Sequence, residues 1–302
     1  SHQFAEMVNA DEASQKLFID RYQEEGLGID YWWMDAGWYP HYGGGWPRVG
    51  TWLVDSNRFP NGLRAVTDHG RAKGVKSIVW FEPERVTEGT MIYDKYPNWL
   101  LGKGGTKLFN LGDDKARTWL TDWIDTLIRE QGIDLYRQDF NMDPLDCWRS
   151  GDTEDRQGIT ENHYVTGYLA YWDALRQRHP GMIIDSCASG GHRNDLETMR
   201  RSLPFLRSDF IFDPVGNQCH TYGLALWLPY HGTGTAAPRQ FSLYELRSNM
   251  SCPKQTPCYD VRDRTLPYEA LRRVVREWRS FADDYLADYY PLTPYSLEED
   301  AR

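Results

Sequence analysis

Leu135-Tyr136-Arg137-Gln138-Asp139-Phe140-Asn141 is the stretch of sequence that decides the fold. It ends an apolar run of the kind that forms a buried strand, and Asp139 stands where that strand gives way to a polar loop. Barrel enzymes place catalytic carboxylates at this position, the carboxyl end of a strand. A single Asp at this position can also simply cap the following helix, so the neighbouring residues must distinguish a catalytic Asp from a helix cap.

A second carboxylate has a similar setting. Asp209 follows Leu206-Arg207-Ser208, two strand–helix units after Asp139. Paired carboxylates on neighbouring strand ends are the minimal equipment for hydrolysing a glycosidic bond. The pair favours a catalytic site over two isolated helix caps, with Asp213 as a weaker rival to Asp209 for the acid.

Apolar runs and helical periodicity alternate along the chain. They predict strands at 29–34, 76–81, 107–111, 135–139, 182–186, 226–230 and just before Asp209, and helices at 11–25, 61–73, 113–131, 161–178, 195–202, 218–225 and 267–286. Strands that alternate with helices at this spacing form a parallel sheet with helices outside. We predict an α/β fold, a (β/α)8 TIM-type barrel. About seven strands can be counted, so we expect the barrel to be truncated before its first strand, which would precede the helix at 11–25.

Composition narrows the class of ligand. The chain has 302 residues, a formal net charge of −10 and an aromatic content of 14%. The negative charge disfavours nucleic acid and an anionic membrane surface as partners, and no apolar run reaches the ~18 residues that span a membrane. Flat aromatic faces stack on the C–H-rich faces of sugars, so the 13 Trp and 19 Tyr favour a neutral carbohydrate ligand.

The cysteines and histidines predict no metal site and no other cofactor. The five cysteines are an odd number and include no Cys-x-x-Cys pair, which disfavours a zinc site and a full disulfide framework. Cys252 and Cys258 could bridge within a loop. His192, His220 and His231 lack metal-like spacing.

Polar and aromatic residues gather where the predicted strands end. They are Asp35, Trp38, Glu82, Glu84, Asp139, Asn141, Cys187, Gly190, Arg193 and Asp209. Clusters at one end of many strands mark the active face of a barrel. Glu82 can also be read as a buried hydrogen-bonded group, Glu84 as a salt-bridge partner and Asp195 as a helix cap.

Six motifs in chain order complete this pattern. They are Trp33-Met34-Asp35-Ala36-Gly37-Trp38, Val49-Gly50-Thr51-Trp52 with Phe59-Pro60-Asn61-Gly62-Leu63, Trp80-Phe81-Glu82-Pro83-Glu84, Arg137-Gln138-Asp139-Phe140-Asn141, Cys187-Ala188-Ser189-Gly190-Gly191-His192-Arg193 and Ser208-Asp209. Together they resemble the bacterial-type α-galactosidases of glycoside hydrolase family 36 over almost the whole chain. That family has a β-sandwich before its barrel and a β-domain after it. The resemblance implies that 1–288 is a catalytic barrel and 289–302 the start of a linker to a C-terminal β-domain.

The resemblance implies a role for each carboxylate. Asp139 would be the nucleophile that attacks the anomeric carbon. Asp209 would be the acid that protonates the leaving oxygen and then the base that activates water. Such a retaining mechanism needs the two carboxyl groups about 5–5.5 Å apart, a raised pKa for Asp209 and an ionised Asp139.

The resemblance also implies a set of sugar contacts. Asp35 would bind hydroxyls on the far side of the ring, Trp80 would belong to a stacking wall, and Arg137 would donate to hydroxyls. Cys187 and Gly190 match positions that line the pocket for the 2-substituent. Trp38, Asn141 and Arg193 complete the predicted set.

Several positions depart from the family pattern. Ala36 replaces an Asp, Arg137 and Gln138 replace Lys and Trp, His192 replaces a Gly, and Asp-Thr-Asp after the acid becomes Phe210-Ile211-Phe212-Asp213. Arg and Lys are not equivalent at a directed hydrogen-bonding site. We therefore expect a divergent subgroup whose substrate sugar could be galactose, N-acetylgalactosamine, an arabinopyranose or another α-linked sugar.

Three functions stay open from the sequence. The first is an α-galactosidase that acts with retention through a covalent glycosyl-enzyme at Asp139. The second is an α-N-acetylgalactosaminidase, and the third is a catalytically silent carbohydrate-binding barrel, against which the carboxylate pair argues. An oligosaccharide or glycoconjugate is the expected partner, with neither nucleic acid nor a membrane involved, and a homo-oligomer is compatible with the sequence.

Overall fold

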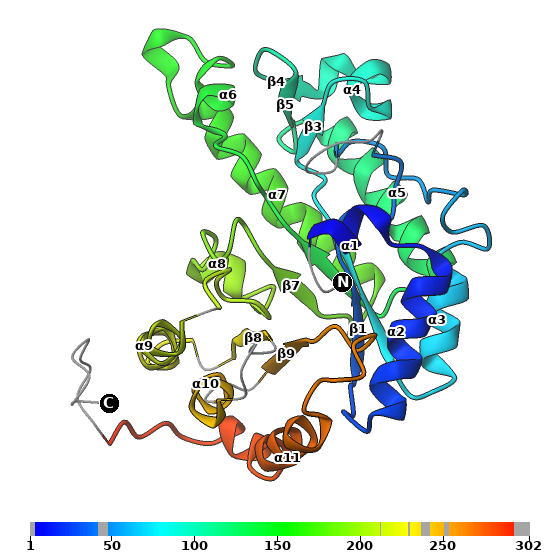
Figure 1. Ribbon diagram of the computed structural model, residues 1–302. Helices are drawn as coiled ribbons and strands as arrows, with labels where there is room; N and C mark the ends of the chain where they lie inside the picture. Colours follow the sequence, from blue (N-terminus) through cyan, green and yellow to red (C-terminus); the bar gives the residue numbers. More distant parts are fainter. Residues whose placement is uncertain are drawn as a thin grey trace.

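The centre of the protein is a parallel four-stranded sheet (Figure 1). The computed structural model describes residues 4–41, 48–211, 213–228, 230–236, 242–250 and 254–292. The strands run in the order β1, β2, β6, β7, which are Tyr31–Met34, Lys76–Phe81, Leu135–Gln138 and Ile184–Ser186. All four residues of β6 are buried, as expected of a strand covered on both faces. These four strands confirm the predicted ones.

Long helices flank this sheet close to their predicted positions. They are α2 (Glu12–Glu24), α3 (Arg64–Arg71), α5 (Asp114–Gln131) and α7 (Ile159–Arg178). Asp11 caps α2 by accepting the backbone N–H of Ser14 at 2.7 Å, and Asp113 caps α5 in the same way. Gly132 ends α5 with a φ of +65°, a left-handed conformation that costs glycine little.

A second parallel pair extends the wall of the barrel. β8 (Gly232–Ala236) pairs with β9 (Lys254–Cys258), and α9 (Pro214–Ala225), α10 (Leu243–Ser248) and α11 (Tyr268–Arg279) lie around them. Residues 203–207 connect the two sheets without forming a strand. The N–H of Leu203 donates to Ile184 O and the N–H of Arg207 to Gly232 O, each at 3.0 Å. The described wall is therefore a partial (β/α)8 barrel.

One predicted barrel strand belongs to a separate sheet. We predict a barrel strand at 107–111, but β5 (Thr106–Phe109) pairs antiparallel with β3 (Arg85–Thr87) and β4 (Leu100–Leu101). With α4 (Met91–Lys95) and the 3-10 helix η1 (Pro97–Trp99), these strands form an excursion between β2 and α5. Apolar patterning does not distinguish a parallel from an antiparallel strand, and the short links here permit antiparallel pairing.

The later strands also differ from the prediction. Residues 226–228 form a turn after α9, with Leu226 60% and Trp227 47% exposed, so the predicted strand at 226–230 is wrong. The strand begins at Gly232, where a Cβ would come within 2.3 Å of Phe205 O, so only glycine fits the wall. The residues directly before Asp209, 203–208, form no regular strand, although a strand was predicted there. In contrast, β9 forms where the sequence predicted no strand.

The remaining elements are short. They are α1 (Phe4–Asn9), α6 (Leu145–Arg149), the 3-10 helix η2 (Glu154–Arg156), α8 (Leu196–Met199) and the 3-10 helix η3 (Ala282–Leu286). The helix predicted at 267–286 divides into α11 and η3. Cys252 and the end of the predicted linker, 293–302, lie outside the described residues, while Cys258 is a free thiol. None of the helices in the described ranges is long and apolar enough to cross a membrane.

The barrel wall is open between its first and last strands. Among the described strands, β1 pairs only with β2 and β9 only with β8. A cavity of about 430 Å³ lies between the two unpaired edges, with Trp33, Ile78 and Phe205 in its lining. The described barrel is therefore not closed at this point.

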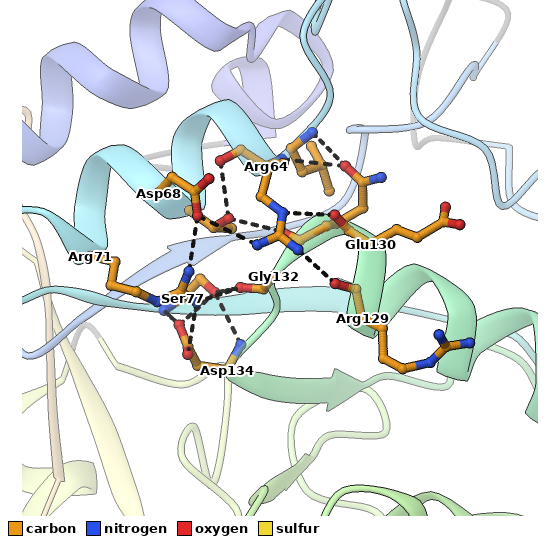
Figure 2. Close-up of polar contacts among 11 residues, drawn as sticks. Arg64, Asp68, Arg71, Ser77, Arg129, Glu130, Gly132 and Asp134 are labelled. Carbon is orange, nitrogen blue, oxygen red and sulfur yellow. Dashed lines mark hydrogen bonds and ion pairs between the residues drawn. The ribbon is translucent and has the colours of Figure 1, made fainter.

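A polar cluster joins the elements at the opposite end of the strands from the predicted site (Figure 2). Asp134 accepts the backbone N–H of Ser77 at 2.8 Å and the Ser77 hydroxyl at 3.1 Å, which ties the start of β6 to β2. Arg71 adds a bond to the same carboxylate. Arg64 donates to two carbonyl oxygens at the end of α5. Contacts at the amino ends of barrel strands support stability rather than catalysis.

We expect Asp134→Ala to lower the free energy of unfolding by about 1–3 kcal/mol, because it leaves the Ser77 N–H without its acceptor. Urea unfolding would measure the effect. Asp114→Ala is the matched control, since the Asp114 side chain is 86% exposed in its ion pair with Arg117. Equal destabilisation by both variants would contradict this assignment.

Candidate active site

The predicted site residues come together at the carboxyl end of the sheet. Asp35 follows β1, Glu82 follows β2, Asp139 follows β6 and Cys187 follows β7. Because neighbouring strands are parallel, their carboxyl ends meet at one edge. The sequence clusters therefore form a single site, to which Asp209 is added by the segment that follows residues 203–207.

Asp139 is buried and fully engaged. Its exposed fraction is 7%, and one carboxylate oxygen accepts the backbone N–H groups of Phe140 at 2.8 Å and Ser189 at 3.3 Å. The other oxygen accepts the indole N–H of Trp80 at 3.1 Å. Three N–H donors directed at one carboxylate stabilise its ionised form.

The environment of Asp139 favours its charge. Burial alone would raise the pKa of this carboxyl, but the positive charge of Arg137 and the N–H donors outweigh burial, and the pKa lies below its ordinary value. A nucleophilic carboxylate has to be ionised, so this shift has the sign that the predicted role requires.

Asp209 shows the opposite shift. Burial, followed by the negative charge of Asp139, raises the pKa of Asp209, while the charges of Arg137 and His192 oppose the change. Asp209 is exposed, whereas Asp139 is buried. Two carboxyl groups whose pKa values are driven apart can serve as an acid and a base.

Gly190 lies directly against Asp209. A Cβ at position 190 would come within 2.8 Å of the backbone nitrogen of Asp209 and 3.1 Å of its carboxyl carbon. The φ of Gly190 is +77°, and Ser189 before it has a φ of +46°, which is strained for a residue with a side chain. This turn is what brings the Ser189 N–H to Asp139 while leaving room for Asp209.

Arg137 lies between the acidic groups. It donates to Asp185 at 2.6 Å, and its guanidinium lies 4.2 Å from the ring centroid of Trp33. Its Nε atom is buried without a hydrogen-bond partner among the described residues. A buried donor of this kind is available to a ligand.

Asp185 is a site residue that the sequence prediction missed. Its side chain is completely buried, and its second oxygen accepts the backbone N–H of Phe205 at 2.8 Å. It holds Arg137 in place through a buried ion pair. The signal was present in the sequence, because Asp185 interrupts the apolar strand 182–186 two positions before Cys187, on the same strand face.

Trp38 and Trp80 are not exposed as sugar-stacking faces. Each is 1% exposed, inside an aromatic cluster with Tyr39, Trp52 and Phe81. The indole N–H of Trp38 donates to Trp80 O at 2.8 Å, and the indole of Trp80 holds Asp139. The contacts of both residues are with the protein, and they position the carboxylate from behind.

Glu82 fixes the loop that carries Asn141. Its completely buried carboxylate accepts the Asn141 backbone N–H at 2.5 Å and is paired with Arg85. Burial raises the pKa of Glu82 against the opposing effect of Arg85. The Asn141 side-chain nitrogen is buried, and the Asn141 side chain helps to lower the pKa of the neighbouring Asp139 by hydrogen bonding. Asn141 therefore supports the ionised form of Asp139.

Glu84 and Arg193 form a second buried pair. Arg193 donates to both oxygens of Glu84, at 2.6 and 2.9 Å, and Tyr164 and Gln138 also donate to this carboxylate. The Arg193 guanidinium lies 4.2 Å from the ring centroid of Phe140. Arg193 thus fastens the turn at Ser189 and Gly190, and Glu84 is the ion-pair partner that the sequence allowed.

Asp35 and Cys187 line the same end of the sheet. Burial raises the pKa of Asp35, against the charge of Arg137, and its carboxylate accepts the Ala36 N–H at 2.8 Å. Burial also raises the pKa of the Cys187 thiol. Among the described residues, neither side chain forms an ion pair, so both can contact a ligand.

The other sequence candidates cap helices. Asp213 accepts the Gly216 N–H at 2.8 Å at the start of α9, and Asp195 accepts the Thr198 N–H at 3.0 Å at the start of α8. Across the described ranges, His, Cys, Asp and Glu side chains form no group of three that could hold a metal ion.

Comparison with known proteins identifies the family. The melibiase family model matches residues 6–238, and the chain belongs to this family. α-Galactosidase 1 of Pediococcus pentosaceus is 27% identical over 233 residues, which are 74% of this chain and 31% of that protein. α-Galactosidase Mel36A of Lactobacillus acidophilus is 28% identical over 189 residues, which are 60% of this chain and 26% of that protein.

Solved structures show the same fold. An α-galactosidase of Geobacillus stearothermophilus superposes with a TM-score of 0.80 at 22% identity, over 91% of this chain and 40% of that one. An α-galactosidase of Lactobacillus brevis gives a TM-score of 0.81 at 22% identity, over 91% and 39%. The chain spans less than half the length of each of these proteins.

We expect Gly190→Ala to lower kcat/KM by roughly 10- to 100-fold, because the added Cβ displaces the Asp209 carboxyl group. Steady-state kinetics of the complete natural protein on a panel of 4-nitrophenyl α-glycosides would measure the loss. Gly181→Ala is the matched control: its φ of +88° carries the same backbone strain, but a Cβ there meets nothing within 4 Å. Equal losses of activity in the two variants would contradict the steric explanation.

Proposed function

We propose that this protein is a retaining glycoside hydrolase that cleaves terminal α-galactosides. The observation that carries the proposal is the pair Asp139 and Asp209, whose pKa values shift in opposite directions at the carboxyl end of a barrel. Membership of the melibiase family supports the same activity.

In the first step, the ionised Asp139 attacks the anomeric carbon and forms a covalent glycosyl ester. Asp209 gives its proton to the glycosidic oxygen, and the leaving group departs as a neutral alcohol. In the second step, the Asp209 carboxylate takes a proton from water as the water attacks the same carbon. The ester bond to Asp139 breaks and the sugar leaves with its original configuration.

Buried donors supply sugar recognition. Arg137 Nε has no hydrogen-bond partner in the described protein and donates to a hydroxyl of the bound sugar. The Asn141 amide, which supports the Asp139 carboxylate, has a second N–H for another hydroxyl. Asp35 accepts hydroxyls on the other side of the ring. Cys187 and Gly190 border the 2-substituent. Relatives solved with stachyose and with raffinose support an oligosaccharide as the substrate class.

The arrangement favours hydrolysis over a silent binding site. A binding site needs donors and acceptors for hydroxyls, but it has no need of two neighbouring carboxyl groups whose pKa values are shifted in opposite directions.

We expect Asp139→Ala to lose at least about a thousandfold in kcat on the preferred 4-nitrophenyl α-glycoside, because no other group can form the glycosyl ester. The panel would hold the glycosides of galactose, N-acetylgalactosamine and arabinopyranose, tested on the complete natural protein. Added azide should restore release in this variant and give the inverted β-glycosyl azide, identified by NMR.

Asp209→Ala provides the complementary arm of that experiment. With azide it should give the retained α-glycosyl azide, because azide then replaces the water of the second step. Preference for the N-acetylgalactosamine substrate would change the proposed sugar but not the mechanism. Full activity in Asp139→Ala, or sugar binding with no release from any substrate, would contradict the proposal.

The pH profile of kcat/KM tests the charge of Arg137. Arg137→Gln, combined with Asp185→Asn so that no buried charge is left alone, should move both limbs to higher pH. Removing the Arg137 cation makes each carboxylate form less favourable, whereas removing the Asp185 anion acts in the opposite direction. The Arg137 effect is the larger, because Arg137 and not Asp185 is among the main influences on the two carboxyl groups, so the pKa of Asp139 (acid limb) and that of Asp209 (alkaline limb) both rise. Arg137→Lys keeps the charge and should leave the limbs near those of the wild type. Unmoved limbs in the double variant would show that Arg137 does not set these values.

A further inference from the structure

Two exposed side chains flank the proposed acid. Phe210 follows Asp209 directly and is 54% exposed. The turn at Gly190 and Gly191, which packs against Asp209 and Arg207, ends in His192, which is exposed and interacts electrostatically with Asp209. Neither side chain is used by the mechanism described above.

The Phe210 ring is held in place despite its exposure. A Cβ on Gly216 would come within 2.6 Å of the ring atom Cε1, so the ring rests directly on the backbone of α9. His220, one turn further along α9, meets the ring edge-on at a centroid distance of 6.3 Å. The Phe210 backbone N–H donates to the Ser208 hydroxyl at 3.1 Å. The exposed face of the ring is therefore a fixed platform.

His192 is positioned by the same close packing. A Cβ on Gly191 would come within 2.3 Å of Arg207 O, so this turn is pressed against the segment that leads to Asp209. The His192 N–H donates to Ala188 O at 3.0 Å and closes the turn. His192 and Phe210 therefore stand on two segments that meet at Asp209.

The reaction decides what lies beside these residues. The acid must contact the glycosidic oxygen, so the leaving group lies next to Asp209, on its solvent side. Asp139 is buried, whereas Asp209, His192 and Phe210 are exposed at the rim, so the leaving group extends toward the two flanking side chains. An aromatic face stacks on the C–H face of a sugar ring, and an imidazole can donate to or accept from its hydroxyls.

We propose that Phe210 and His192 form the binding site for the leaving-group sugar, so that the protein prefers a carbohydrate over a small leaving group. This inference rests on the proposed function. It also gives a role to two positions at which the chain departs from the family pattern, since both departures flank the acid.

The test compares two substrates in the complete natural protein. Melibiose carries a glucose leaving group, whereas α-galactosyl fluoride carries none that could reach Phe210. Phe210→Ala should lower kcat/KM for melibiose about tenfold and leave the value for the fluoride within about twofold of the wild type. His192→Ala should show the same selectivity with a smaller loss. Phe210→Tyr keeps the ring and should retain the wild-type ratio.

Trp227→Ala is the matched control, because Trp227 is an exposed aromatic residue that follows the far end of α9. Trp227→Ala should leave kcat/KM unchanged for both melibiose and α-galactosyl fluoride. Activity on the fluoride also shows that each variant is folded. A melibiose-to-fluoride ratio that stays at the wild-type value in Phe210→Ala overturns the leaving-group site alone. A wild-type protein that cleaves neither substrate overturns the proposed function as well.

Discussion

The carboxylate of Asp139 has to stay charged inside the protein, and the carboxyl end of the sheet is arranged around that requirement. A buried carboxylate without compensation would take up a proton. Trp80 and two backbone N–H groups bind it, and Arg137 supplies the positive charge. Arg137 is itself buried, so Asp185 has to compensate it in turn. The catalytic proposal follows from this chain of buried charges, because the negative charge of the ionised Asp139 adds to burial in raising the pKa of Asp209, against the opposing charge of Arg137.

A second buried pair gives the site its shape. Glu84, at the end of β2, holds Arg193, and Arg193 fastens the turn that contains Ser189 and Gly190. The strained backbone of Ser189 is maintained by its contacts: its N–H donates to Asp139 and its hydroxyl to Asn141. Gln138 belongs to this network, since it donates to Glu84 at 2.7 Å and accepts from the buried Trp172. The departure from the family pattern at position 138 is therefore accommodated by polar partners rather than by an aromatic contact.

Local sequence predicted the parts of the fold that depend on local physics. Asp11 and Asp113 mark helix starts through their capping bonds, and the buried strand 76–81 contains the apolar run Ile78-Val79-Trp80-Phe81. Pairing partners are not local, so the antiparallel β5 was assigned to the barrel and β9 was missed. Asp185 was missed for the same reason, because its role exists only through Arg137 on the neighbouring strand.

The sequence by itself determined the barrel class, the two carboxylates and the glycine turn beside them, because each depends on residue type at a fixed place along the chain. Only the tertiary structure decided what each residue does. It turned Trp38 and Trp80 from expected sugar contacts into the buried support of Asp139, and it joined Glu84 to Arg193 across a sequence separation of 109 residues. It also set the opposite pKa shifts of Asp139 and Asp209. These properties follow from burial and from charges on other strands, and neither is encoded by any single stretch of the chain.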